Sequence, residues 1–407
     1  MILHEPEIKK AGEEITISSR VEINSPNTKG RLKSLWVKVP EGQGAFISDY
    51  SNGFAVALLF LAMNLGEDLE IRGKMSPRLL FGMMEFQKCF KLWFSETLRK
   101  IIDIQCEKLI PQTQENNTMI NACAFSGGVD SFYTLWSHLP GKEKLDGFQI
   151  SHALFVGGVS SPTLEDEETY KLSKLSYEKV TQKLNVKLLT AETNFKEAIL
   201  DKVSKNLAYG TSLIGTILIL SQKFSHFYIS SGYPYQTPFI EGTNFRTDHL
   251  LSTESLELIN DGASVSRLQK TAVIAQWPET FSHLRVCWHS IPDMGFNNCC
   301  RCAKCIRTMV SLSLLGALSK YPTFPKPLRR RDILNARFLS DGDRYFIHEI
   351  IDYAASEGRA DVAFYLRCAL WLSSVSKWLK QKAPALHQAL CTLLGKKTSG
   401  QEISEGN

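Results

Sequence analysis

The chain has 407 residues, which is more than one small hydrophobic core needs and enough for two or three domains of ordinary size. Its hydrophobic fraction of 43% and charged fraction of 22% are close to those of folded proteins, so the composition argues against a disordered or fibrous chain. The formal charge of +5 is mild for this length and does not favour a nucleic-acid partner.

The first residues lack the charged-then-apolar pattern of a signal peptide. The longest apolar stretch, at residues 54–63, is far shorter than the roughly 20 residues that a membrane span needs. We therefore predict a cytoplasmic protein that has no contact with a membrane.

Residues 1–116 predict an α+β domain. Apolar and polar residues alternate in its strands, because successive side chains of a strand face opposite sides of the sheet. The first helix ends at Gly66, and the second begins at Ser76, a capping residue that a proline follows. The predicted strands span residues 14–18, 35–39, 69–72 and 101–104, and the predicted helices span residues 54–65 and 76–94. We find no catalytic constellation in this domain and expect it to contact a protein partner.

From residue 117 to residue 320 strands and helices alternate, which predicts an α/β domain with a parallel sheet and helices on both of its faces. The predicted strands span residues 120–125, 150–156, 186–189 and 226–230, and the predicted helices span residues 129–138, 164–184 and 212–224. Ligands of such a sheet bind at the carboxyl ends of its strands. Residues 321–395 predict a helical region, with helices at 338–354 and 361–379, and residues 396–407 predict a flexible tail.

The sequence SGGVDS at residues 126–131 stands between a predicted strand and a predicted helix. Backbone amides and the positive end of the helix dipole converge at such a corner and form an anion site. Two glycines let the backbone approach phosphates, and Asp130 can bind the Mg²⁺ that bridges them. The GxxxxGK pattern of kinases and motor-type ATPases is absent. The alternative to an anion site at residues 126–131 is an ordinary glycine-rich turn between a strand and a helix. The residues expected to hold the polyphosphate of ATP are Ser126, Gly127, Gly128, Val129 and Ser131.

This segment resembles the PP-loop of the N-type ATP pyrophosphatases. The resemblance implies that ATP is split between its α- and β-phosphates, that an acid is adenylated, and that a nucleophile then displaces AMP. It also implies that backbone groups at Phe155 hold adenine and that Gly210 contacts the nucleotide at the start of the next helix. An ordinary core strand and a helix cap remain the alternatives for these two positions.

Four of the ten cysteines lie within seven residues, and a fifth stands upstream at the end of a strand predicted over residues 283–286. Thiols crowded in this way in a reducing compartment hold a metal more often than they form disulfides. Four thiolates can enclose one tetrahedral, structural Zn²⁺, and Cys300 is then spare. An iron–sulfur cluster remains the alternative, because spacing alone does not choose the metal. The predicted ligands are Cys287, Cys299, Cys302 and Cys305.

The loop, followed far downstream by this pattern of cysteines, resembles the 7-cyano-7-deazaguanine synthase (QueC-like) branch of the superfamily. The resemblance covers residues 119–315 and implies a 7-deazaguanine-type carboxylate, ATP, ammonia and a structural zinc. Gly232 and Tyr233 resemble part of the family's base-binding segment, although the Asp-Cys pair that follows in the family is absent. Lys270 stands where the family has a lysine, and it is the expected catalytic cation for the leaving pyrophosphate.

Divergent, extended proteins of this kind occur in bacterial antiviral defence operons, where they resemble enzymes that join a deazaguanine to a partner protein. An amine of a partner protein is therefore a second candidate acceptor. In the loop after the fourth strand, Arg246 could pair with a carboxylate and Asp248 could accept a hydrogen bond from a guanine amine edge. Ordinary solvated loop residues remain the alternative for both.

Three functions remain open at this point. The first is an enzyme that adenylates a deazaguanine carboxylate and works by positioning and electrostatics, with no protein nucleophile. The second is an RNA sulfurtransferase of the same superfamily, which needs a reactive cysteine and a basic surface that the mild charge disfavours. The third is a non-catalytic module that keeps ATP or a base as a structural ligand and holds a partner through the flanking domains.

Overall fold

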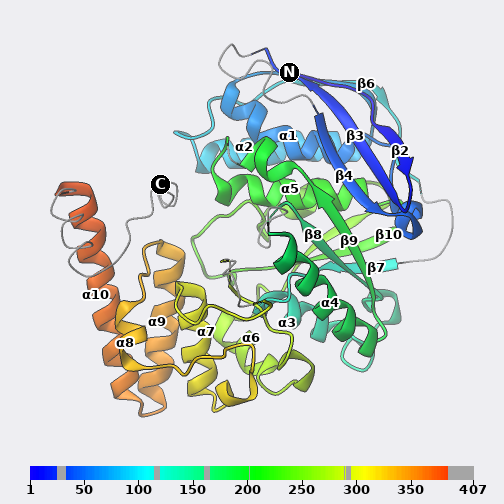
Figure 1. The fold of residues 1–407 in the computed structure, drawn as a ribbon. Helices are drawn as coiled ribbons and strands as arrows, with labels where there is room; N and C mark the ends of the chain where they lie inside the picture. Colours follow the sequence, from blue (N-terminus) through cyan, green and yellow to red (C-terminus); the bar gives the residue numbers. More distant parts are fainter. Residues whose placement is uncertain are drawn as a thin grey trace. The chain divides into compact units, whose positions relative to one another are not determined.

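The computed structural model describes residues 1–24, 34–113, 120–159, 166–200, 202–287, 289 and 295–383. The chain has an α/β fold and divides into two compact units, which are described separately below (Figure 1). The first unit comprises Met1–Ser266 with Trp288–Ser290, and the second comprises Arg267–Cys287 and Ile291–Asn407. These units do not coincide with the boundaries predicted at residues 116 and 320, and the predicted tail at residues 396–407 lies outside the described residues.

The centre of the first unit is a parallel sheet in which the strands lie in the order β9-β8-β7-β10-β11. The strands are β7 (Ile120–Ala124), β8 (His152–Gly157), β9 (Lys187–Thr193), β10 (Phe224–Ser230) and β11 (Glu257–Asp261). The helices that connect them are α3 (Val129–Ser137), α4 (Glu167–Lys183) and α5 (Lys205–Ile219). The chain moves from β7 toward β9 and then returns to the other side of β7, so the strand order reverses between β7 and β10. Ligands of open parallel sheets bind at such a reversal.

The sheet continues into the N-terminal elements, because β9 pairs antiparallel with β4 (Ser34–Pro40). The further N-terminal strands are β1 (Ile2–Leu3), β2 (Glu7–Ala11), β3 (Glu14–Glu22), β5 (Leu69–Met75) and β6 (Ile104–Leu109), and the helices are α1 (Asn52–Leu65) and α2 (Pro77–Trp93). β4 pairs with β3, β3 pairs with both β2 and β1, and the path ends with β5 and β6. Within the described ranges, one sheet of eleven strands therefore includes residues from both sides of position 116.

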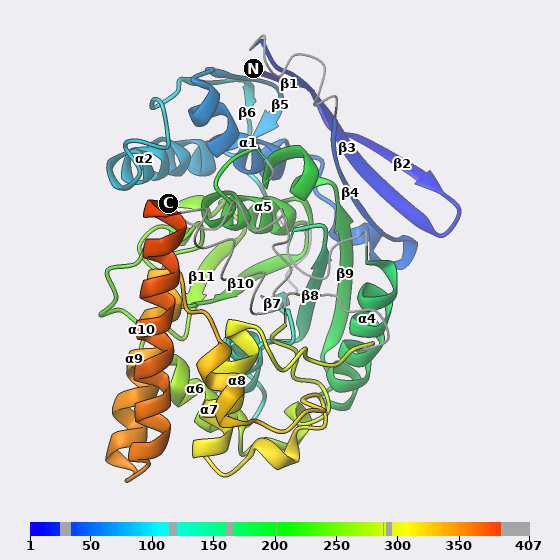
Figure 2. The ribbon, with the colours of Figure 1, turned by 60° about the vertical axis from the view of Figure 1, so that its left-hand side comes forward.

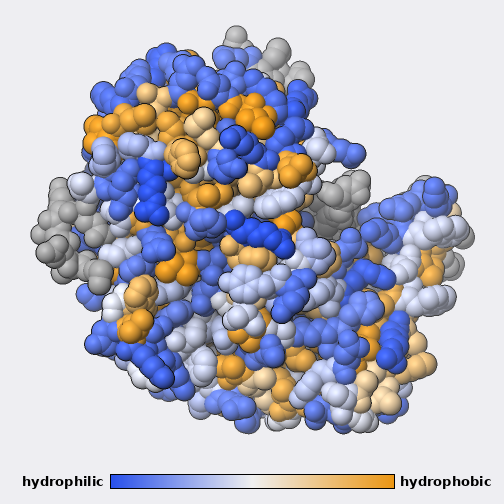
Figure 3. All heavy atoms as spheres, turned by 180° about the vertical axis from the view of Figure 1, so that it is seen from behind, coloured by the Kyte–Doolittle hydropathy of each residue, from blue (hydrophilic) through white to orange (hydrophobic). Residues whose placement is uncertain are grey.

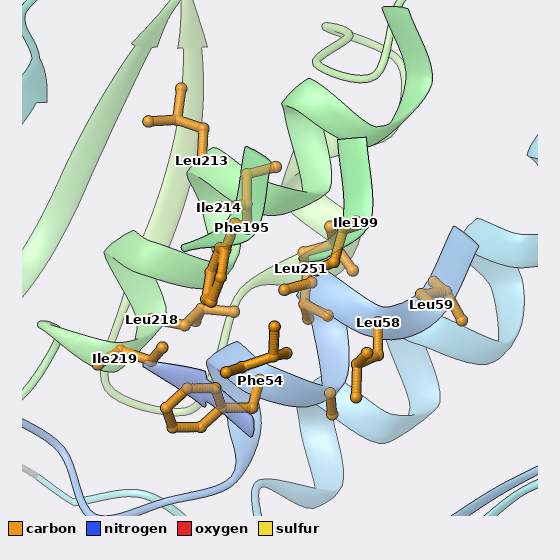
Figure 4. Packing of buried hydrophobic residues seen from close by; sticks show 14 of the residues in the cluster. Phe54, Leu58, Leu59, Phe195, Ile199, Leu213, Ile214, Leu218, Ile219 and Leu251 are labelled. Carbon is orange, nitrogen blue, oxygen red and sulfur yellow. The ribbon is translucent and has the colours of Figure 1, made fainter. Parts of the chain in front are cut away.

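Helix α1 packs directly on α5 and explains why the N-terminal elements belong to the same unit. A side chain at Gly53 would overlap the carbonyl oxygen of Gly215, so the two helices approach closely only because both positions are glycine. Figure 4 shows Phe54 of α1 near Leu218 and Ile219 of α5 in one buried cluster. Burial of these apolar side chains stabilises the two parts together, and neither has a separate core at this contact.

The local signals of the N-terminal elements are confirmed. Gly66 follows α1 in the left-handed conformation, and the Ser76 side chain accepts a hydrogen bond from the amide of Leu79 at the start of α2. Other bounds differ, since β6 begins only at Ile104 and α5 begins at Lys205, seven residues before the predicted start. Short 3₁₀ or π-helical turns lie at Glu41–Phe46, Asp146–Phe148, Lys196–Leu200, Asp248–Leu251, Pro278–Thr280 and Leu318–Lys320.

The second unit is helical. Its helices are α6 (Arg267–Ile274), α7 (Ala303–Leu314), α8 (Arg330–Asn335), α9 (Asp341–Ser356) and α10 (Ala360–Lys382). The long helices α9 and α10 lie side by side (Figure 2). The strand predicted over residues 283–286 is wrong, because Leu284, Val286 and their neighbours form no sheet ladder. No helix among the described residues combines the length and apolar character needed to cross a bilayer.

Candidate functional site

The segment of residues 126–131 forms the corner between β7 and α3, at the point where the strand order reverses. Gly127 has a φ of +67°, a left-handed conformation that favours glycine, and Gly128 is the capping residue of α3. A side chain at Gly127 would overlap the ring of Tyr177, which lies on α4. The Tyr177 hydroxyl donates a hydrogen bond of 2.7 Å to the carbonyl oxygen of Ser126. Tyr177 therefore fixes the shape of this corner.

Hydrogen bonds inside the corner hold the start of α3. The Ser131 hydroxyl accepts from the amide of Gly128 at 3.1 Å and lies 3.3 Å from the hydroxyl of Ser126. Ser131 is buried, Gly128 and Asp130 are half-buried, and Ser126 is exposed. The corner therefore combines an exposed hydroxyl, a half-buried carboxylate and the positive end of the α3 dipole, which together can bind an anion and its counter-cation.

A cluster of buried aromatic rings packs beneath the backbone of the corner, on the side of the core. Phe125 meets the rings of Phe132 and Tyr177 edge to face, with ring centres 5.0 and 5.3 Å apart. Phe155, at the end of β8, stacks on Tyr170 and meets Tyr177 edge to face. The side chain of Phe155 is thus a core residue, and contact between its backbone and adenine stays a prediction.

Gly210, the second predicted nucleotide contact, lies inside α5. A side chain at Gly210 would overlap the backbone of Gly242, and the Gly242 amide donates to the carbonyl oxygen of Asn206 at 2.8 Å. The glycine therefore lets the loop after β10 pack directly on α5. Contact between Gly210 and a nucleotide stays a prediction.

The segment that contains Gly232 and Tyr233 follows β10, the strand next to β7. The Ser231 amide donates to the carbonyl oxygen of Asp261 at 2.7 Å, and the Tyr233 ring lies 5.5 Å from the ring of Phe239. Both predicted residues are half-buried. The structure thus brings this segment and the corner of residues 126–131 to the carboxyl ends of adjacent strands.

Arg246 and Asp248 have different environments. The Arg246 guanidinium lies 4.7 Å above the ring of Phe245 and donates to the carbonyl oxygen of Thr237, but the side chain is exposed. Asp248 is 0% exposed, and its two carboxyl oxygens accept hydrogen bonds from the Asn244 amide and the Asn260 side chain. Burial raises the pKa of Asp248 to about 7, although both hydrogen bonds oppose this shift. The Asp248 side chain therefore joins its own loop to β11.

A polar network that the sequence analysis missed joins α3 to β11. Thr134 donates to one carboxyl oxygen of Asp261 at 2.7 Å, and the other oxygen lies 3.1 Å from Nε2 of His138. The Nδ1 atom of His138 lies 3.1 Å from Glu143. Burial by itself would lower the pKa of His138, but hydrogen bonds and charges from Asp261 and Glu143 raise it. Only the spacing of Thr134 and His138, one helical turn apart, was visible in the sequence.

The four predicted cysteine ligands meet in the second unit, where their sulfur atoms all lie within 4.8 Å of one another. The sulfurs of Cys299 and Cys305 are 3.6 Å apart. Tetrahedral Zn²⁺ with Zn–S bonds of about 2.3 Å places two sulfurs about 3.8 Å apart. Three of the four cysteines are buried and Cys302 is half-buried, as in closed structural sites. The four cysteines can therefore hold a metal such as zinc.

Backbone amides and one buried asparagine hold the cysteines in place. The amide of Cys302 donates to the sulfur of Cys299, and the amide of Cys305 donates to the sulfur of Cys302, which caps α7. Asn298 accepts hydrogen bonds from the amides of Val286 and Cys287 and donates to two carbonyl oxygens. The hydrogen bonds from the amides of Val286 and Cys287 to Asn298 take the place of the predicted strand pairing and position Cys287 beside the other ligands. Hydrogen bonds of this kind, made to the ligands and to their backbone, orient metal ligands.

Two predicted residues remain to be placed. The thiol of Cys300, predicted to be spare, lies 3.4 Å from the carbonyl oxygen of Asn298 and is not in the cluster of four. Lys270 is buried on α6 and belongs to the second unit, whereas Asp130 belongs to the first.

Comparisons of the chain with protein-family models, with curated proteins and with solved structures find no match. The interpretation of the two sites therefore rests on their geometry and chemistry.

Proposed function

We propose that the chain is an ATP-dependent adenylating enzyme of the PP-loop superfamily, which activates a carboxylate for attack by an amine. The observation that carries the proposal is the position of the SGGVDS corner, at the carboxyl end of β7 where the strand order reverses. A glycine in the left-handed conformation and a helix start at this position suit a polyphosphate.

In the proposed reaction, the amides of the corner and the hydroxyls of Ser126 and Ser131 bind the phosphates of ATP. Asp130 would hold Mg²⁺, which neutralises the charge of the polyphosphate when it is bound. An oxygen of the substrate carboxylate attacks the α-phosphorus, the bond to the bridging oxygen breaks, and pyrophosphate leaves. The amine then attacks the activated carbonyl carbon and AMP leaves. The catalytic role of Lys270 is part of the proposal as an electrostatic contribution to the departure of pyrophosphate.

The proposed acid is a 7-deazaguanine-type base. Its support is the position of Gly232 and Tyr233 after β10, next to the strand that carries the phosphate corner. Arg246, which is exposed in the same stretch of chain, is the proposed partner of the carboxylate. The proposed acceptor is ammonia or an amine of a partner protein, within a bacterial antiviral defence system, and the zinc is structural.

The N-terminal elements are the proposed contact for such a protein partner. Large apolar side chains are exposed there, with Phe81 and Leu92 of α2 at 76% and 79% exposure. Figure 3 shows apolar side chains gathered in the upper part of the back of the molecule. Exposed apolar side chains that lie near one another are common at protein interfaces.

An exchange assay tests the proposal. Purified protein is mixed with ATP, labelled pyrophosphate and a carboxylated 7-deazaguanine, and incorporation of label into ATP is measured. We expect exchange that depends on the acid and that falls roughly 100-fold or more in Asp130→Ala, because a group that acts on developing charge is lost. Asp146→Ala, which removes an exposed carboxylate elsewhere in the same unit, is the matched control. Exchange that needs no acid, or that survives in Asp130→Ala, contradicts the proposal.

The two alternative functions predict other results. An RNA sulfurtransferase would transfer sulfur to tRNA through a reactive thiolate. Cys123, the cysteine nearest to the corner in the chain, is fully buried in β7, and burial raises its pKa, which disfavours such a thiolate. A non-catalytic module would bind ATP tightly and show no exchange with any acid.

A further inference from the structure

Helix α10 carries a stripe of exposed aromatic side chains in the second unit. Phe364, Trp371 and Trp378 are exposed to 60%, 66% and 58%, and successive members are seven residues apart. Seven residues correspond to two helical turns, so the three rings lie on one line along the helix. Tryptophan is rarely left this exposed when a surface has no partner.

The residues between the aromatic side chains complete a regular pattern. Cys368 and Val375 are half-buried, and together with the three rings they give spacings of four, three, four and three residues. This alternation is that of the seam between two helices in a coiled coil. The opposite side of α10, including Leu366 and Leu370, is buried in the core of the second unit. The stripe is thus a second apolar face, which the described residues of this unit leave exposed.

The charges around the stripe are mainly positive. The exposed charged residues of α10 beyond its first turn are Arg367, Lys377, Lys380 and Lys382. Asp361, in the first turn, forms an ion pair with Arg359 at 3.1 Å. Helix α8, which packs on α10, adds Arg330, whose guanidinium lies over the ring of Tyr365. Arg367 and Lys382 each lie four residues from a ring of the stripe, and Lys377 lines the groove beside Trp378, so a partner on this face meets a mainly basic border.

A groove beside the stripe gives the face its shape. It has a volume of about 210 Å³ and is lined by Asp341, Arg344, Ser374, Lys377, Trp378 and Gln381. The indole of Trp378 forms one wall, and the charged residues of the lining are two cations, Arg344 and Lys377, and one carboxylate, Asp341. An apolar side chain with an acidic neighbour fits such a groove.

We infer that the Phe364–Trp371–Trp378 face of α10 docks one α-helix of another protein, whose apolar residues follow the same spacing and are flanked by Asp or Glu. Helix pairing explains the spacing of the stripe, and charge complementarity explains the basic border. A second copy of this chain fits less well, because its own α10 would bring the same positive charges against this face.

Two synthetic helical peptides test the inference. Both span about three heptads with leucines at the seam; the first carries glutamates at the flanking positions and the second carries lysines. Each is labelled, kept at nanomolar concentration and titrated with the full chain while fluorescence anisotropy is recorded. We expect saturable binding of the acidic peptide alone, and a loss of affinity of roughly tenfold or more in Trp371→Ser. The control Leu175→Ser removes an exposed apolar side chain from another helix, α4, and leaves the affinity unchanged.

Several outcomes overturn the inference. Equal binding of both peptides shows nonspecific apolar binding, and an equal loss in Leu175→Ser shows that the stripe has no special role. Light scattering that finds a dimer of the wild type and a monomer of Trp371→Ser makes a second copy the occupant. Binding that requires deletion of residues 384–407 makes the chain's own C-terminal segment the occupant. Circular dichroism and metal content, both unchanged in Trp371→Ser, establish that the variant is folded.

Discussion

The phosphate corner and the cysteine cluster differ in what they need to be complete. The cysteine cluster brings four ligands to one place within one unit, and amides and Asn298 orient them. The corner of residues 126–131 is shaped just as firmly, by Tyr177 and Ser131, but its outer edge is open. A closed site of this kind contributes to stability, whereas an open one leaves its donors for a ligand.

This difference separates the consequences of mutation in the two regions. A change at the cysteines should act on the folding of the second unit before it acts on chemistry. A change at the corner should act on ATP with little effect on folding. The following variants break or sharpen this comparison.

The largest effect is expected from Cys299→Ser. It removes one of four ligands, and a structural Zn²⁺ contributes on the order of 10 kcal/mol to the folding of small domains. We expect loss of bound zinc and unfolding of the second unit, measured by mass spectrometry of metals and by limited proteolysis. Cys300→Ser is the matched control, because Cys300 lies in the same turn but outside the cluster. One zinc per chain in Cys299→Ser would show that the four sulfurs are not the site, and iron with inorganic sulfide would identify a cluster instead.

Gly127→Ala should damage the corner and spare the fold. The left-handed backbone costs an alanine about 1–2 kcal/mol, and the new methyl group overlaps the ring of Tyr177. Because a displacement of about 1 Å at reacting groups can cost roughly 100-fold in rate, we expect ATP–pyrophosphate exchange to fall by about that factor. Gly141→Ala is the control, since Gly141 also has a positive φ but has open space around it. Similar exchange rates in the two variants would mean that the shape of the corner does not matter for ATP.

Asp248→Asn tests whether the loop after β10 acts on folding, as the cysteine cluster does, or on ligand binding, as the phosphate corner does. The pKa of Asp248 is raised from 3.8 to about 7 in the folded chain, so the folded state binds the proton more tightly than the unfolded state. Wild-type stability should therefore fall as pH rises from about 4 to about 7, and the uncharged asparagine should lose most of this dependence. Urea unfolding at several pH values measures it, with the exposed Asp103→Asn as the control. If the carboxylate instead binds substrate, exchange falls in Asp248→Asn while the pH dependence of stability stays as in the wild type.

Local signals in the sequence predicted much of the fold. The caps at Gly66 and Ser76, and the strand-to-helix corner at residues 126–131, lie where short-range patterns place them. The pairing of β4 with β9 joins residues about 150 positions apart, and no local pattern encodes it. This pairing is the reason why the first unit includes the N-terminal elements, although the polar stretch before residue 117 reads as a linker.

In the two sites, too, local patterns were predictable from the sequence and long-range contacts were not. The spacing of the cysteines identified all four clustered residues, because three of them lie within seven residues, at the start of α7 and in the turn before it. The strand predicted for the fourth was wrong, since the backbone there bonds to the Asn298 side chain and not to a neighbouring strand. Tyr177 stands about 50 residues from the corner that it shapes, and Asp261 more than 120 residues from Thr134. Contacts of this kind come from the packing of whole elements and are not visible in one sequence.

The smallest effect, and the sharpest test of the comparison, is expected from Tyr177→Phe. This change keeps the ring that faces Gly127 and removes only the hydroxyl that donates to the carbonyl oxygen of Ser126. Loss of a buried hydrogen bond costs about 1 kcal/mol, which corresponds to roughly fivefold in affinity if the bond holds the ATP-binding shape. Tyr228→Phe is a close control, because its buried hydroxyl donates in the same way to the carbonyl oxygen of Phe148, away from the corner. We expect both variants to lose similar stability in urea and only Tyr177→Phe to require more ATP for half-maximal exchange. If the two variants require the same ATP concentration, the hydroxyl of Tyr177 stabilises the fold without shaping the site for its ligand. Its role would then be like that of Asn298 beside the cysteines.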